Sequence, residues 1–94
     1  MTLTKAEMTE IDEMLQARKK THGPFKLHAE VVDGFHDAAS PYLSNKSPVQ
    51  REVVRMIFHK LARVLVGDGC YKDHWVDIAG YATRATEEID NESL

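Results

Sequence analysis

Apolar residues recur along the chain with the spacing of α-helices. Near the N-terminus, Met8, Ile11 and Leu15 repeat at intervals of three and four, which is typical of a helix with one buried face. Thr4 precedes them and forms the pattern of a capping box with the glutamate three residues later. We therefore predict a first helix over residues 5–20, with its apolar stripe packed against the rest of the chain.

A second apolar stripe follows His22-Gly23-Pro24, a sequence that ends the first helix. Pro24 can be the first residue of the next helix, because its missing N–H would have no partner there. The expected buried face of this helix consists of Leu27, Val31, Val32, Phe35 and Ala38. Gly34 within it predicts a close packing contact or a bend, since glycine weakens a helix interior. Ser40-Pro41 and Ser44-Asn45-Lys46 are expected to form the middle loop.

Ser47-Pro48-Val49-Gln50 is the strongest helix-start signal, because it combines a capping hydroxyl, a proline in the first turn and an amide side chain. It predicts a third helix over residues 48–66, closed by Gly67. A broad apolar arc marks this helix as the central one, and it consists of Val53, Val54, Ile57, Phe58, Leu61, Val64 and Leu65. The positions expected on its solvent side are Arg51, Arg55 and Ala62.

Asp73 is the expected N-cap of a fourth helix that reaches about Glu88. Its inward positions are Trp75, Ile78, Ala82, Ala85 and Ile89. The loop over residues 67–72 is short, so the third and fourth helices should form an antiparallel hairpin. Residues 89–94 are expected to be a frayed acidic tail. No strand pattern competes, and the chain is predicted to be one all-α, four-helix domain over residues 1–94.

Composition agrees with a small globular domain. Of 94 residues, 43% are hydrophobic and 29% charged, which is too apolar for a disordered chain. So short a chain has a thin core, and we expect a homo-oligomer to complete it. The single cysteine, Cys70, excludes an internal disulfide. The polar start and the absence of an apolar run near 20 residues predict neither a signal peptide nor a membrane partner.

Charged residues form a stripe where the third and fourth helices should face each other. Lys60 and Arg63 are expected near Asp73 and Asp77, because both pairs lie close to the connecting loop. One interpretation is interhelical salt bridges, which usually contribute less than about 1 kcal/mol. The other is a ligand site in which the two carboxylates hold Mg²⁺ and the basic pair meets a phosphate. Direct DNA binding is not expected, because the net charge is −3 and carboxylates open the fourth helix.

The histidines and the cysteine give weaker signals. The five histidines are His22, His28, His36, His59 and His74, and they lack the spacing of zinc ligands. His28 and His36 lie eight residues apart on one predicted helix and are expected to share a face. Cys70 has no neighbour that would clearly activate it as a nucleophile.

Three sequence elements resemble a family of short phage and prophage proteins. They are Arg18 followed by His22-Gly23-x-Phe25, then Glu52-x-x-x-Met56-x-x-x-Lys60-x-x-Arg63, and finally Asp73-x-x-x-Asp77-x-Ala79-Gly80-Tyr81. The likeness spans residues 18–81, and its closing element is the specific part. The resemblance implies a viral or prophage origin, a bacterial cytoplasmic setting and a helical fold. It supplies no catalytic residues.

The helical pattern is also loosely similar to the all-α nucleotide pyrophosphohydrolases. Their magnesium site uses Glu-x-x-Glu on one helix and Glu-x-x-Asp on another. Here Glu10-x-x-Glu13 matches the first half, whereas the second half is absent in that form. This departure weighs against hydrolysis.

These observations leave three hypotheses. The first is a non-catalytic binding protein, a host-takeover or anti-defence accessory that inhibits a host bacterial protein or sequesters a nucleotide-like anion. Its expected ligand-binding residues are Arg18, His22, Gly23, Lys60, Arg63 and Tyr81. The second is a magnesium-dependent nucleotide hydrolase with Asp73 and Asp77 as metal ligands. The third is protein–protein recognition through an exposed apolar patch made of Met14, Tyr42 and Leu43.

Overall fold

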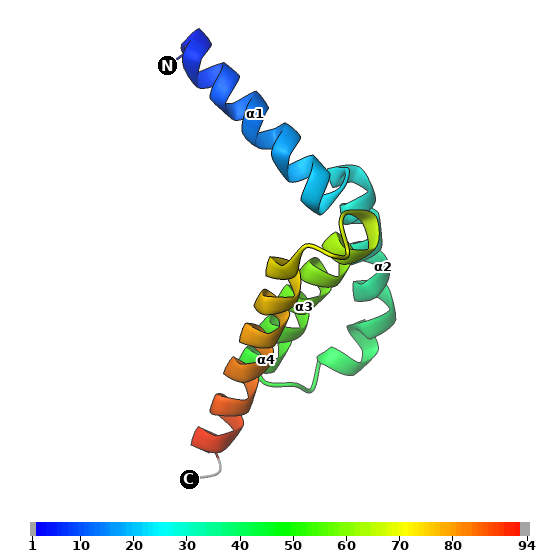
Figure 1. Cartoon of the computed structure of the whole chain (residues 1–94). Coiled ribbons are helices and arrows are strands. Elements are labelled where there is room, and N and C mark those ends of the chain that lie inside the picture. Colours follow the sequence, from blue (N-terminus) through cyan, green and yellow to red (C-terminus); the bar gives the residue numbers. More distant parts are fainter. Residues whose placement is uncertain (1, 93–94) are drawn as a thin grey trace.

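The computed structural model describes residues 2–92 and consists of helices joined by short loops (Figure 1). The elements in chain order are α1 (Lys5–His22), α2 (Phe25–Leu43), α3 (Pro48–Val66) and α4 (Lys72–Glu92). The described residues contain no strand, so the all-α prediction is confirmed. None of the described helices combines the length and the apolar character that a membrane span requires.

The helix starts follow the local chemistry of the sequence. The hydroxyl of Thr4 accepts a hydrogen bond from the backbone N–H of Glu7 at 3.1 Å, and the reciprocal half of the capping box is present as well. Ser47 and Gln50 form a second capping box at the start of α3. The bounds predicted for the third helix are confirmed.

Several other boundaries differ from the prediction, and α1 ends at His22 rather than at residue 20. Pro24 is the N-cap of α2 rather than its first residue, and α2 continues through Pro41 to its end. A proline in the last turn leaves only the carbonyl of Asp37 without its helical donor, and this exposed residue is open to water. The helix α4 begins at Lys72, one residue before the expected cap, because the Tyr71 carbonyl already accepts the N–H of His74 at 3.2 Å.

The fourth helix is longer than expected, whereas the fraying of the acidic tail stays a prediction. The helix α4 continues through residues 89–92. Positions 93–94 of the predicted tail lie outside the described residues.

The body of the molecule is built from α2, α3 and α4. The helices α3 and α4 run antiparallel in close contact, which confirms the predicted hairpin, and α2 packs on α3 (Figure 1). Val32, Val53 and Ala62 are buried between them, and the rings of Phe35 and Phe58 lie 5.2 Å apart.

Some predicted faces of the body are wrong. Ala62 was expected on the solvent side but has no exposed surface, because neighbouring elements cover more of α3 than its apolar arc indicated. The residues predicted to face inward that are instead exposed are Leu27, Ala38, Leu65, Trp75, Ala82 and Ile89. The close contact predicted at Gly34 is absent, since a Cβ added there would meet no neighbouring atom within 4 Å.

The helix α1 projects from the body as an arm (Figure 1). None of its residues is buried, and the side chains of Met8 and Leu15 are both 53% exposed. The predicted burial of its apolar stripe is therefore wrong. Among the described residues, the arm meets the body only near its C-terminal end (Figure 1).

The arm is joined to the body by a close contact between two glycines. Gly23 has a φ of 78°, and a Cβ added there would lie 2.1 Å from the carbonyl oxygen of Val66. A Cβ added to Gly67 would lie 2.4 Å from the carbonyl oxygen of Thr21. Both positions require glycine, because these contacts are with backbone atoms that have little freedom to move.

Hydrogen bonds close the same junction. The carbonyl oxygen of Thr21, at the end of α1, accepts the backbone N–H of Asp68 at 2.9 Å. It also accepts the ring Nε2–H of His74 at 2.8 Å, and this histidine is only 1% exposed. The loop before α4 thereby satisfies a carbonyl that the helix end leaves unpaired.

Candidate functional site

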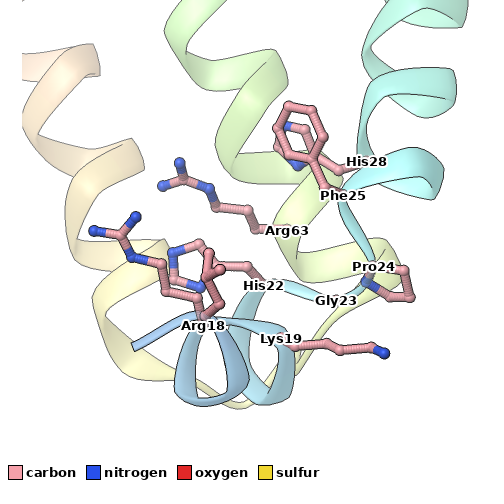
Figure 2. Close-up of a pocket in the computed structure, with 9 residues that line it drawn as sticks. Arg18, Lys19, His22, Gly23, Pro24, Phe25, His28 and Arg63 are labelled. Atoms are coloured by element: carbon pink, nitrogen blue, oxygen red, sulfur yellow. The ribbon is translucent and has the colours of Figure 1, made fainter. Parts of the chain in front are cut away.

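A cavity of about 480 Å³ lies beside this junction. It is formed by the end of α1, the start of α2 and the C-terminal half of α3, and Figure 2 shows it in close-up. Its lining residues are Leu15, Arg18, Lys19, His22, Gly23, Pro24, Phe25, His28 and Arg63. None of these is a carboxylate, and the volume lies within the usual range of about 300–1,000 Å³ for small-molecule sites.

Two arginines dominate the electrostatics of the cavity. Figure 2 shows the guanidinium groups of Arg18 and Arg63 extending in the same direction near the ring of His22, whereas the ammonium end of Lys19 points the other way. Within residues 2–92, neither arginine forms a salt bridge. Their donors are therefore available to an anion, and guanidinium groups bind phosphate in a bidentate geometry.

The pKa values of the two lining histidines are lowered, which favours their neutral form. Burial and the positive charge of Arg63 lower the pKa of His22, with smaller contributions from His74, Lys60 and Arg18. Burial also lowers the pKa of His28, followed by the charges of His59 and Arg63. An anion in the cavity would counter these charges and favour protonation of both rings.

His28 connects the cavity to the interior of the body. Its Nε2 lies 3.0 Å from the Nδ1 of His59, so one ring donates a hydrogen bond to the other. On the cavity side, the ring of Phe25 stacks on His28 with an interplanar angle of 12°. His28 and His36 share the face of α2 that meets α3, as expected, because the ring of His36 contacts Phe58 of α3 edge-on at 5.5 Å.

Four of the six predicted ligand-binding residues line this cavity: Arg18, His22, Gly23 and Arg63. Lys60 does not, because its ammonium group forms a salt bridge with Asp77 at 2.8 Å. That pairing confirms the predicted proximity of the two charged stripes. Tyr81 also lies outside the cavity lining, and the guanidinium of Arg84 sits 5.9 Å from the centre of its ring.

The two carboxylates predicted as metal ligands have other partners. The hydrogen bond from Lys60 lowers the pKa of Asp77. The charge of Asp73 and its hydrogen bond raise the pKa of Tyr71. Among the residues that the structure describes, no group of three or more histidine, cysteine, aspartate or glutamate side chains is placed to hold a metal ion.

Five lining residues were not predicted: Leu15, Lys19, Pro24, Phe25 and His28. Some signal for them was present, because Lys19 adjoins Arg18 and because Phe25 belongs to the His22-Gly23-x-Phe25 element. Their convergence depends on the angle at which α1 leaves the body, and helical periodicity carries no information on that angle.

The apolar patch predicted from Met14, Tyr42 and Leu43 is not a single surface. Met14 belongs to the arm, whereas Tyr42 and Leu43 lie in the last turn of α2. Figure 1 shows the arm and this end of α2 far apart.

Comparison with known proteins adds no relative. No protein-family model matches the chain, and neither the curated proteins nor the solved structures gave a match. The resemblance of residues 18–81 to a phage family therefore stays a prediction, and the cavity is the feature that bears on function.

Proposed function

We propose that the chain is a binding protein that captures a small phosphorylated anion in the cavity beside the junction. The observation that carries this proposal is the composition of the lining, which holds three cationic side chains, two histidines and no carboxylate. The whole chain has 15 acidic and 12 basic residues. The absence of carboxylates beside these cationic side chains is thus a local arrangement and not a consequence of overall composition.

The side chains that line the cavity favour binding of an anion over magnesium-dependent hydrolysis of a nucleotide. Magnesium-dependent hydrolysis of a nucleotide needs oxygen ligands for the ion, chiefly carboxylates. The cavity lining supplies none, and Asp77, which is not part of the lining, forms a salt bridge with Lys60. Arginine and histidine side chains instead neutralise and orient a bound phosphate.

The cavity also favours one of the two targets considered from the sequence. A concave site of this volume suits a small molecule, whereas an interface with a protein buries a much larger surface. We therefore favour a nucleotide-like anion over a host protein as the target. The homo-oligomer and the role in phage infection stay predictions.

Calorimetric titration with inorganic pyrophosphate tests the proposal. The unmodified chain should bind pyrophosphate, and Arg18→Gln and Arg63→Gln should each weaken binding at least about tenfold, because each removes a charged hydrogen-bond donor from the anion. Arg84→Gln is the matched control, since it removes the same charge from an exposed position outside the cavity. Absence of binding, or equal losses in all three variants, would contradict the proposal.

A further inference from the structure

The most exposed large apolar side chain at the cavity is Phe25. It is 82% exposed although it opens α2 at the edge of the site. Packing in the core does not account for an aromatic side chain in this position. Exposed apolar surface beside a concave site is a common mark of ligand contact.

One side of the Phe25 ring is supported by a ring that is itself held in place. The ring of His28 lies parallel to it, with centroids 6.0 Å apart. His28 is 7% exposed and hydrogen-bonded to His59, so Phe25 rests on a buried and fixed neighbour. Figure 2 shows the two rings overlapping beside the extended side chain of Arg63. This arrangement leaves a supported aromatic face next to the anion-binding groups.

We infer that the anion is a nucleotide whose phosphate binds Arg18 and Arg63 and whose base stacks on Phe25. The inference rests on the proposed function, because it places the phosphate in the same site. A planar base on an aromatic side chain strengthens binding by roughly 5- to 150-fold, whatever the base, because every base has a π-face. A cavity of about 480 Å³ provides space for a mononucleotide.

The stacking role belongs to Phe25 and not to Tyr81, the aromatic residue expected from the sequence. Phe25 lines the cavity together with both arginines, whereas Tyr81 does not. A phosphate and a base attached to the same ribose can therefore reach both kinds of group only at the Phe25 site.

Titrations with phosphate, adenosine monophosphate and adenosine separate the two contributions. The unmodified chain should bind adenosine monophosphate at least about tenfold more tightly than phosphate. Phe25→Leu should remove most of that difference, whereas Phe25→Trp should retain it. Tyr42→Leu is the matched control, because Tyr42 is 73% exposed and lies outside the cavity.

The outcomes distinguish this inference from the proposed function. If phosphate binds but adenosine monophosphate binds no more tightly, the nucleotide inference is overturned and the anion site stands. If Phe25→Leu weakens phosphate binding equally, the ring has a structural role and the inference fails. If neither phosphate nor adenosine monophosphate binds, both proposals fail. Adenosine that binds as tightly as its monophosphate would likewise overturn the inference, since the arginines would then contribute nothing.

Discussion

The arm α1 and the central helix α3 are both predicted as helices by apolar spacing and a capping box, yet only α3 is part of a core. Both begin with a capping box, and both are longer than the roughly 12–15 residues below which an isolated helix is marginal in water. Val53 and Ala62 of α3 are buried, whereas no residue of α1 is. Periodicity and capping therefore predict that a segment is helical, but they do not decide whether its apolar face finds a neighbour.

The junction between arm and body should be the most sensitive point in the molecule. Gly23→Ala places a Cβ at a φ of 78° and 2.1 Å from a backbone carbonyl oxygen. We expect it to reduce the free energy of unfolding by about 3 kcal/mol or more, since strain and a backbone clash act together. Urea denaturation followed by circular dichroism measures this loss.

Gly34→Ala is the control for this prediction. The same substitution in the open space around α2 should increase the free energy of unfolding by about 0.5–1 kcal/mol. Similar effects at the two glycines would show that the close contact at Gly23 does not constrain the chain.

Replacement of His74, the buried histidine of the junction, should have the next largest effect on stability. His74→Ala removes a side chain that is 1% exposed and leaves the Thr21 carbonyl without its ring donor. A loss of about 2–3 kcal/mol in the free energy of unfolding is expected from the cavity and the broken hydrogen bond. Lys72→Ala, at an exposed neighbouring position, should change stability by less than about 0.5 kcal/mol. If His74→Ala lowers the free energy of unfolding by less than 1 kcal/mol, the His74 side chain does not contribute to holding the arm against the body.

Matched truncations compare the arm and the body directly. Val53→Ala in α3 should cost about 1–2 kcal/mol, because this side chain is 8% exposed. Met8→Ala removes a larger side chain from α1, but the side chain is 53% exposed, so the cost should stay below about 0.5 kcal/mol. The two values are measured at a protein concentration low enough to disfavour association. A larger loss for Met8→Ala would show that the arm's stripe is packed in solution.

The pH dependence is the smallest expected effect on stability, and it belongs to the junction and the adjoining body. The pKa values of His22, His28 and His59 are all lowered from 6.5 in the folded chain. Below pH 6.5 the unfolded chain therefore binds more protons than the folded one, and the free energy of unfolding should fall as the pH decreases. Urea denaturation between pH 8 and pH 5 measures it. A free energy of unfolding that rises as the pH is lowered from 8 to 5 would contradict the lowered pKa values of these histidines.

The sequence predicted features that depend on nearby residues and missed those that depend on how helices meet. The start of α3 is a local matter of Ser47, Pro48 and Gln50. The pairing of Lys60 with Asp77 follows from a short loop that permits one arrangement of two helices. The contact between Gly23 and Gly67 brings together backbone segments more than 40 positions apart, so local patterns could not reveal it.

The candidate site likewise combines residues that local sequence predicts with residues that only the packing of the helices brings together. Arg18, His22 and Gly23 were predicted from one sequence element of the resemblance, and Arg63 from the charged stripe beside the apolar arc. The place of His28 could not be predicted, because its partner His59 lies 31 positions away on another helix. Tyr81 belongs to the closing element of the resemblance, but it does not line the cavity.

The measurement closest to the central claim is an NMR titration of the histidine rings with inorganic phosphate at constant pH. His22 and His28 line the cavity, whereas His36 lies against Phe58 outside its lining. The ring signals of His22 and His28 should shift in a saturable way, and the pKa values of both should rise in the bound state, because an anion favours the imidazolium form. His36 should stay unchanged. Equal shifts of all the histidines, or no shift of His22, would show that the junction does not bind phosphate.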